Sequence, residues 1–148
     1  MERAFSDTSA NVLVAEDDEY LRNAIASSIR ELGHTVESVA DGGRLLVTLA
    51  QAMKRERLSW PDLIVSDVRM PVMSGLSMAI AIASLERTIP VILVTAFPDE
   101  ELARRVQQLS FVHILGKPFE LHTLQGLVST CLSARRPARR ADIQLLRT

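Results

Sequence analysis

The segment VSDVRMP, residues 65–71, places a carboxylate where an apolar run ends. Asp67 follows Leu63-Ile64-Val65 and Ser66, a run typical of a buried strand. A lone carboxylate in that environment is costly to desolvate unless a cation or a reaction needs it. Reactive groups stand at the ends of three other short apolar runs, and they are Glu16, Asp17, Thr95 and Lys117.

Carboxylates gathered at one place repel one another unless a hard cation lies among them. Mg²⁺ suits such a site, because it takes oxygen ligands and retains several waters. A carboxylate beside Mg²⁺ can attack a phosphoryl group and form an acyl phosphate. The Lys117 ammonium and the Thr95 hydroxyl would then hold the phosphoryl oxygens and offset the developing charge. The residue types therefore indicate phosphoryl transfer to Asp67.

These side chains need a scaffold that brings them together, and the chain alternates short apolar runs with longer helical patterns. The predicted strands are residues 11–15, 35–39, 63–66, 90–95 and 111–115. The predicted helices are residues 19–32, 41–56, 75–86, 99–109 and 120–132. This alternation predicts a parallel sheet covered by helices on both faces. Active sites in such sheets lie beyond the carboxyl ends of the strands, where the reactive groups stand.

Bulk composition restricts the classes of function. The 148 residues suffice for one domain, and 47% hydrophobic with 24% charged residues is ordinary for a globular protein. A net charge of −1 argues against a general polyanion binder. The single cysteine, Cys131, excludes an intrachain disulfide and favours an inert core position in a reducing compartment. No apolar run could span a membrane and residues 1–10 show no signal peptide, so we expect a cytoplasmic protein with no membrane partner.

Four motifs resemble the receiver domain of bacterial two-component response regulators, in the family's order and spacing. They are VLVAEDD at 12–18, LIVSDVRMPVMSGL at 63–76, VILVTA at 91–96 and GKPF at 116–119. The resemblance covers residues 10–133 and implies an α/β, doubly wound (βα)5, flavodoxin-like three-layer sandwich with parallel strand order 2-1-3-4-5. The expected organisation is a disordered N-terminal extension at 1–10, a receiver domain at 11–133 and a flexible basic tail at 134–148. Few residues follow the last predicted helix, so we expect a stand-alone receiver.

The resemblance also implies roles for the acidic residues. Asp67 resembles the phosphoacceptor, and Glu16 and Asp17 resemble the acidic pair that binds Mg²⁺, with Asp17 the more direct ligand. Arg69 matches the position that binds the metal through its backbone carbonyl, so its exposed side chain is free to vary. Asp18 fits an N-cap of the helix 19–32 better than a metal ligand, and Asp41 fits the N-cap of the helix that runs to about residue 56.

The remaining positions concern switching and output. Thr95 matches the switch hydroxyl, and Lys117 matches the phosphate-contacting lysine, which a cis peptide before Pro118 aims inward in the family. The family commonly has an aromatic residue three positions before this lysine. Ile114 stands there and cannot reproduce the aromatic rotamer switch. The expected output surface spans the helix 99–109, the strand 111–115 and the start of the last helix, with Arg104, Arg105 and Ile114 on it.

The C-terminal tail is basic and has two interpretations. Pro137 lies among its arginines and argues against a continuous helix through it. We interpret the tail as solvated and mobile; the alternative is an electrostatic contact to nucleic acid or an acidic partner. Without interleaved aromatic residues, sequence-specific nucleic-acid binding is not expected. The arginines are Arg135, Arg136, Arg139 and Arg140.

The predicted function is that of a phosphoacceptor receiver in a two-component phosphorelay. A histidine kinase or histidine phosphotransfer protein would donate to Asp67 with Mg²⁺, and an unknown downstream protein would read the changed surface. The protein would act only on its own Asp67 and is no conventional enzyme; homodimerisation stays open. The alternative is a phosphorylation-independent, degenerate receiver acting as an interaction module, favoured by Ile114 and by Ser110-Phe111 where the family has Gly-Ala. A haloacid dehalogenase-like phosphohydrolase would need an acid where Arg69 stands.

Overall fold

The computed structural model describes residues 9–55, 60–85 and 88–147, with side chains described as far as residue 134. Five parallel strands form one sheet in the order β2-β1-β3-β4-β5, as predicted. In chain order they are β1 Asn11–Ala15, β2 Thr35–Val39, β3 Leu63–Asp67, β4 Val91–Thr95 and β5 Val112–Gly116.

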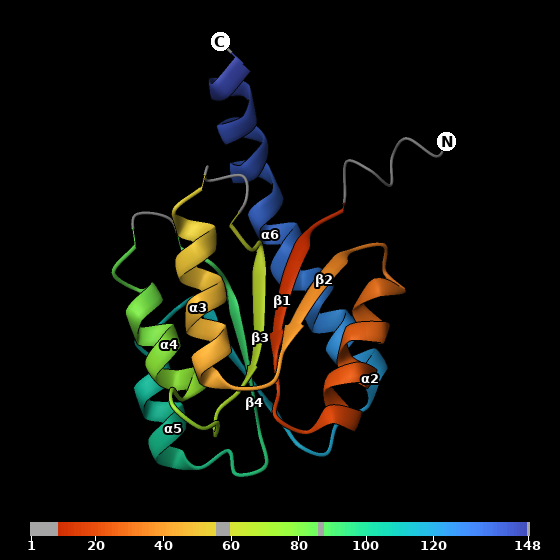
Figure 1. The fold of residues 1–148 in the computed structure, drawn as a ribbon, viewed down its shortest axis with the longest axis vertical. Coiled ribbons are helices and arrows are strands. Elements are labelled where there is room, and N and C mark those ends of the chain that lie inside the picture. The colour runs from red at the N-terminus through yellow and green to blue at the C-terminus, as the bar shows by residue number, and fades with distance from the viewer. Residues whose placement is uncertain (1–8, 56–59, 86–87, 148) are drawn as a thin grey trace.

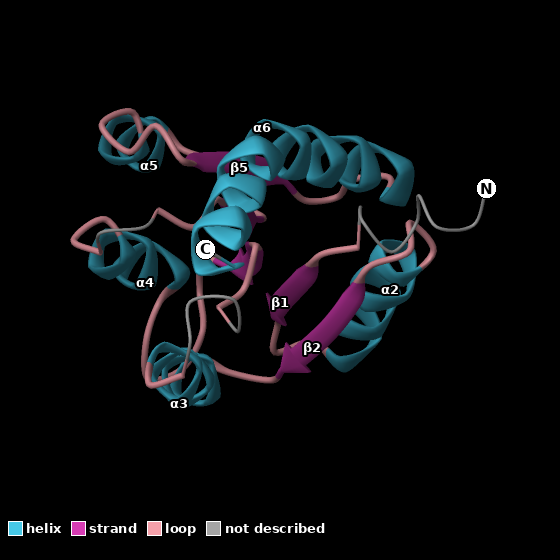
Figure 2. Cartoon of the chain, turned by 90° about the horizontal axis from the view of Figure 1, so that it is seen from above, coloured by secondary structure: helices cyan, strands magenta, loops and turns pink. Residues whose placement is uncertain are grey.

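Helices cover both faces of the sheet, which makes the predicted three-layer sandwich (Figures 1 and 2). The helices α3, α4 and α5 lie on one face, and α2 and α6 lie on the other (Figure 2). Their bounds are α2 Glu19–Arg30, α3 Gly42–Met53, α4 Gly75–Ile82, α5 Glu100–Val106 and α6 Leu121–Arg147. Among the described residues, no helix combines the length and apolarity that a membrane span requires.

The central strands form two cores because their side chains alternate between the faces of the sheet. Leu13 and Ile64 join the cluster under α3, α4 and α5. Val12 and Val65 join the cluster under α2 and α6, where Cys131 is buried as expected. Every residue of β3 and of β4 is buried, so apolar residues follow one another without alternation until the polar residues at the carboxyl ends of the two strands. This central position fixes the end of β3, and with it Asp67.

Side-chain caps begin four of the helices, including the two caps predicted from sequence. The carboxylates of Asp18 and Asp41 each accept a hydrogen bond of 2.8 Å from a backbone N–H three residues on. Ser74 and Asp99 cap α4 and α5 in the same way. The helices α2, α3 and α4 end two to four residues earlier than their patterns predict. The starts of the helices were therefore predicted more accurately from capping residues than their ends were from hydrophobic periodicity.

The last helix differs from its prediction. We expected it to end at residue 132, but α6 runs through Pro137 to Arg147 and extends beyond the sheet (Figure 1). A proline inside a helix removes one hydrogen bond and its ring crowds the carbonyl four residues before, which can kink a helix instead of ending it. The neighbours of Pro137 are arginine and alanine, which favour helix. The arginine side chains of the predicted tail, and residues 1–8 of the predicted extension, lie outside the described residues. The flexibility of the tail stays a prediction.

Candidate functional site

The strand-end residues singled out from the sequence come together at the carboxyl end of the sheet. Glu16 and Asp17 directly follow β1, Asp67 and Thr95 end β3 and β4, and Lys117 directly follows β5. The side chains of Glu16 and Asp67 are buried, with 1% and 8% of their surface exposed, whereas Asp17 is exposed. Two acids in a buried environment at one point require compensation from their neighbours.

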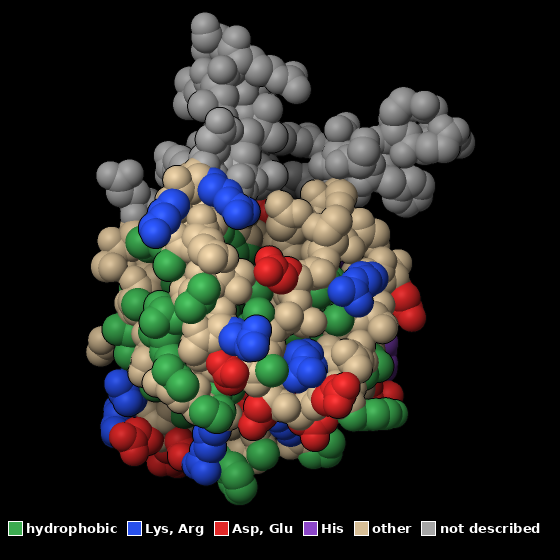
Figure 3. All heavy atoms as spheres, in the orientation of Figure 1, with side chains coloured by type: hydrophobic (Ala, Val, Ile, Leu, Met, Phe, Trp, Pro, Cys, Tyr) green, Lys and Arg blue, Asp and Glu red, His purple; other side chains and the backbone are tan. Residues whose placement is uncertain are grey.

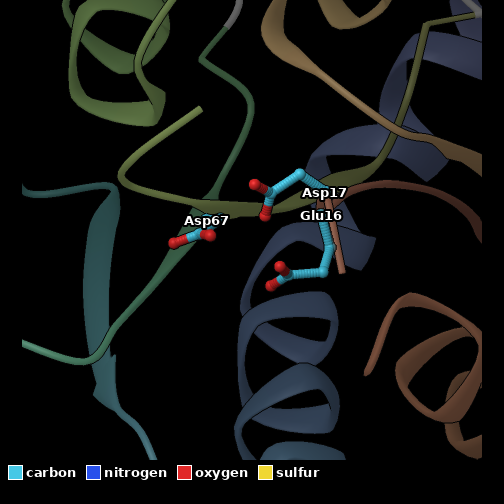
Figure 4. Close-up of side chains that lie close together, drawn as sticks. All are labelled: Glu16, Asp17 and Asp67. Carbon is cyan, nitrogen blue, oxygen red and sulfur yellow. The ribbon is translucent and has the colours of Figure 1, made fainter. Parts of the chain in front are cut away.

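Three carboxylates form the centre of this site. One oxygen from each of Glu16, Asp17 and Asp67 can be chosen so that all three lie within 4.8 Å of one another. Figure 4 shows the three side chains directed into the same space from β1 and from β3. Three negative charges so close together repel one another, and a nearby cation is needed to offset this repulsion.

The side chain of Lys117 supplies a positive charge next to these carboxylates. Its Nζ lies 3.4 Å from Asp67 Oδ2 and 3.2 Å from Glu16 Oε1. Burial lowers the pKa of Lys117, but the close contact and charge of Glu16 and then the charge of Asp67 outweigh burial, so the net pKa is raised. The backbone N–H of Lys117 bonds to the Thr95 carbonyl at 2.7 Å, and the peptide before Pro118 is cis, as expected. The lysine is thereby held charged and directed toward the acids.

Burial and neighbouring charges act together on the carboxylate of Glu16. Burial, together with the nearby charge of Asp67, raises its pKa to about 6, against a lowering by the Asp18 backbone N–H and by Lys117. The Asp18 N–H donates to Glu16 Oε2 at 3.2 Å. Glu16 Oε1 faces Lys117 but accepts no well-formed hydrogen bond within the described part of the chain. A buried carboxylate oxygen without a hydrogen bond is one that a bound cation could satisfy.

The loop after Asp67 is fixed by close backbone contacts. Arg69 N–H donates to Asp67 Oδ1 at 3.4 Å, and the Gly75 N–H donates to the Val68 carbonyl at 3.0 Å. A Cβ at Gly75 would collide with the carbonyl oxygen of Asp67 and meet Leu93 Cδ2 at 3.0 Å. Only glycine lets α4 begin so close to the end of β3.

Thr95 and Arg69 border the site from neighbouring loops. Thr95 is buried, and its Oγ1 accepts a hydrogen bond of 3.0 Å from the Phe97 N–H. Arg69 is exposed, as predicted, and its guanidinium lies 4.9 Å from the centre of the Phe97 ring. Sequence reasoning missed Phe97; its only signal was an aromatic residue two positions after Thr95.

The donor set fits Mg²⁺. The available ligands are hard carboxylate oxygens, one of which is exposed toward solvent, and Mg²⁺ prefers such oxygens while keeping several waters. Glu16, Asp17 and Asp67 could therefore hold the ion. His34, His113 and His122 lie outside this carboxylate cluster.

The positions expected to form an output surface lie on one side of the molecule. Arg104 and Arg105 are exposed on α5, and Ile114 on β5 is partly buried against the core. An open groove of about 750 Å³ runs between α5 and β5, and Arg104, Ile114 and Leu127 line part of it. Ile114 thus contributes apolar area to the wall of this groove.

Comparison with known proteins agrees with this geometry. The family model for the response regulator receiver domain matches residues 12–129. The transcriptional regulatory protein PdtaR of Mycobacterium tuberculosis is 34% identical over 122 residues, which are 82% of this chain and 56% of PdtaR. The DNA-binding transcriptional regulator NtrC of Escherichia coli is 30% identical over 82% of this chain and 24% of its own length. The chain thus spans about half of one relative and a quarter of the other.

Solved structures give the same result. The chemotaxis protein CheY4 of Vibrio cholerae matches with a TM-score of 0.68 and 29% identity, over 83% of this chain and 98% of CheY4. The receiver domain of the Francisella response regulator 1452 matches with a TM-score of 0.71 and 25% identity, over 84% of this chain and 98% of that domain.

Proposed function

Because this chain belongs to the response regulator receiver domain family of two-component systems, we propose that Asp67 accepts a phosphoryl group from a phosphohistidine donor. One observation carries the proposal. The Asp67 carboxylate lies in a cluster with Glu16 and Asp17 within 4.8 Å, and 3.4 Å from the Lys117 ammonium. A nucleophilic carboxylate, metal-binding acids and a fixed cation are the groups that an acyl phosphate site needs.

The transfer is a displacement at phosphorus. One oxygen of the Asp67 carboxylate attacks the phosphorus atom and forms the new P–O bond, while the P–N bond to the donor imidazole breaks. The imidazole nitrogen keeps the electron pair of the broken bond. The Lys117 ammonium is placed to pair with the transferred oxygens, and the Thr95 hydroxyl is placed to donate a hydrogen bond to one of them.

Mg²⁺ would be held by Glu16, Asp17 and Asp67, with the backbone carbonyl of Arg69 as a further ligand by family resemblance. When bound, the ion offsets the charge of the carboxylates and of the incoming phosphoryl group. Glu16 and Asp17 keep the ion beside Asp67 while the nucleophilic oxygen remains available. Hydrolysis of this acyl phosphate would return the protein to its unphosphorylated state. The protein would therefore modify its own Asp67 and would not turn over separate substrate molecules.

Output would follow from a shift between two conformers of the surface formed by α5, β5 and the start of α6. Arg104 and Arg105 give this surface a charged, exposed part, and Ile114 gives it an apolar part. The donor would be a histidine kinase or histidine phosphotransfer protein, and the reader of the surface would be another protein. The switch would rely on Thr95 with an aliphatic side chain at position 114, in place of the family's aromatic rotation.

The test is phosphorylation of the purified protein by acetyl phosphate with Mg²⁺, read as a change in intact mass. The wild type should gain one phosphoryl group, and lose this gain when a chelator removes the metal. Asp67→Asn should gain none. Asp62→Asn is the matched control, because Asp62 is also buried and accepts a hydrogen bond of 2.8 Å from the Asn11 N–H, yet lies before β3 at the opposite end of the strand.

Two results would contradict the proposal. Phosphorylation that persists in Asp67→Asn would mean that another residue is the acceptor. A wild type that binds Mg²⁺ but gains no phosphoryl group from acetyl phosphate or from a phosphohistidine protein would favour the phosphorylation-independent module instead.

A further inference from the structure

Phe97 is an exposed aromatic residue at the edge of the site around Asp67. It follows the end of β4 by two positions, and 61% of its surface is exposed. Neither of the two core clusters includes it. Figure 3 shows charged side chains of both signs beside hydrophobic ones along the lower edge of the molecule, where Figure 1 places the carboxyl ends of the strands. Because little of its ring is removed from water, packing of the core does not explain Phe97 at this position.

The ring of Phe97 lies against the guanidinium of Arg69. The guanidinium carbon is 4.9 Å from the ring centre, which is a cation–π distance. Arg69 is itself exposed, and within the described part of the chain it forms no ion pair. The acids that follow Phe97 in the sequence are Asp99, Glu100 and Glu101; Asp99 caps α5, and none of the three pairs with Arg69. The charge of Arg69 therefore has an aromatic ring as its partner and no carboxylate.

The backbone connects both members of this stack to the site. The Arg69 N–H donates to Asp67 Oδ1 at 3.4 Å, and the Phe97 N–H donates to Thr95 Oγ1 at 3.0 Å. Arg69 thus begins beside the carboxylate of Asp67, and its long side chain can extend toward the ring or toward that carboxylate. A hydroxyl can accept one hydrogen bond while it donates another. Thr95 can therefore donate to a phosphoryl oxygen and remain bonded to the backbone of Phe97.

Phosphorylation would change the charge balance beside Arg69. In the unphosphorylated site, Lys117 and the proposed Mg²⁺ offset the charges of the three clustered carboxylates. A phosphoryl group carries about two negative charges, whereas the free carboxylate of Asp67 carries one. The phosphorylated site is therefore more negative than these two cations offset, and it attracts a further positive group.

Arg69 is available to meet this charge. The guanidinium of Arg22, which also lies near the site, already donates to the Glu16 carbonyl oxygen at 2.9 Å. A guanidinium binds phosphate oxygens through paired, charge-assisted hydrogen bonds, whereas a cation–π contact at an exposed position is weak. A phosphoryl group on Asp67 therefore binds Arg69 more strongly than the Phe97 ring does.

We propose that Arg69 is a phosphoryl-binding residue of this site, held by Phe97 until Asp67 is phosphorylated. The guanidinium then leaves the ring and binds the phosphoryl oxygens. Phe97 loses its cation while its backbone stays bonded to Thr95, so its ring is the aromatic group that responds to phosphorylation. This inference rests on the proposed function, because it requires an acyl phosphate at Asp67.

The first test is the rate at which acetyl phosphate with Mg²⁺ phosphorylates the full chain, followed by intact mass. Arg69→Gln should slow the reaction at least about fivefold, because the variant lacks the charge that offsets the transferred group. Arg69→Lys should fall between this variant and the wild type, because an ammonium keeps the charge without the paired N–H groups. Phe97→Leu should react at least as fast as the wild type, because it frees the guanidinium and keeps the backbone N–H.

Arg55→Gln is the matched control. It removes the same charge from another exposed arginine, which lines a hollow with Asn11 and Thr35 at the amino ends of β1 and β2. The phosphorylation rate of this variant should equal that of the wild type. Thermal unfolding of all four variants should stay close to that of the wild type, because the substituted side chains are exposed.

The second test observes the Phe97 ring and reads no activity. The protein is labelled with fluorinated phenylalanine, and the fluorine resonance that Phe97→Leu lacks is assigned to Phe97. Beryllium fluoride with Mg²⁺, a mimic of the phosphoryl group on a carboxylate, should shift this resonance in the wild type. In Arg69→Gln the resonance should differ before the addition and change little after it, because the ring has no cation to lose.

Three outcomes would overturn the inference, and they separate it from the proposed function. If the wild type is phosphorylated at Asp67 and Arg69→Gln reacts as fast, or if the Phe97 resonance does not move, Arg69 does not bind the phosphoryl group and the proposed function stands. If Arg69→Gln and Phe97→Leu both react faster than the wild type, the stack only covers the site. If the wild type gains no phosphoryl group, the proposed function fails and this inference fails with it.

Discussion

The carboxyl end of the sheet and the outer side of α3 and α4 both hold side chains in the environment opposite to the one they favour. At the strand ends, the acids Glu16 and Asp67 are buried from water. On α3 and in the loop before α4, the apolar side chains of Leu46 and Val72 are exposed to water, at 48% and 85%. The buried acids have compensation within the chain, because Lys117 lies within 3.4 Å of both. The exposed apolar side chains lack comparable cover in the described structure. The first region gathers charged groups that compensate one another, and the second leaves apolar area open to solvent.

The largest expected effect separates the two sides of α3. Leu45→Ala should lower the free energy of unfolding by about 2–5 kcal/mol, because it leaves a cavity in the core. Leu46→Ala, one residue on, should change it by less than about 0.5 kcal/mol. Urea denaturation of the two variants checks this difference. Equal losses would mean that Leu46 is covered in the free protein, and the contrast with the strand-end site would fail.

The next effect concerns the glycine that lets α4 begin against β3. Gly75→Ala should lower the free energy of unfolding by about 1–3 kcal/mol, because the new Cβ would overlap the Asp67 carbonyl oxygen and crowd Leu93. It should also slow phosphorylation by acetyl phosphate, since Asp67 must shift. Gly126→Ala is the matched control, because this glycine of α6 has no atom within 4 Å of the added Cβ. That change should raise the stability by up to about 1 kcal/mol through helix propensity.

The strand-end site was predictable from sequence for a physical reason. Parallel strands bring their carboxyl ends to one edge, so the residues after each apolar run must meet once the strand order is known. Asp67 and Lys117 are 50 positions apart in the chain. They were expected to meet because each stands at the carboxyl end of a predicted strand. The caps Asp18 and Asp41 were predictable because capping depends only on residues three positions apart.

The exposed apolar side of α3 was not predictable in the same way. The segment Leu45-Leu46-Val47 is apolar throughout, so periodicity alone does not tell which of its side chains faces the core. The stacking of Arg69 on Phe97 joins two loops, and the left-handed backbone of Val72 contradicts the preference of its own residue type. The continuation of α6 through Pro137 likewise depends on the helix around it. Tertiary context decides all three.

The third prediction concerns the acid–metal balance of the strand-end site. Burial raises the pKa of Glu16 to about 6, so this carboxyl takes up a proton as the pH falls through that value. Because the protonated form cannot bind a cation, Mg²⁺ affinity should fall about tenfold between about pH 7.5 and pH 5. Isothermal titration calorimetry over this range measures the change. Glu16→Gln should bind Mg²⁺ more weakly at neutral pH and show a much flatter profile; an unchanged profile would place the titrating group elsewhere.

The smallest expected effect tests the exposed region directly. Val72→Gly should raise the free energy of unfolding by about 1 kcal/mol, because it relieves left-handed strain of about 1–3 kcal/mol while adding backbone freedom to the unfolded chain. Val47→Gly, an equal loss of side chain within α3, should instead lower it by about 1 kcal/mol. Urea denaturation measures both changes, and a loss of stability in Val72→Gly would show that the valine supports the loop in the free protein.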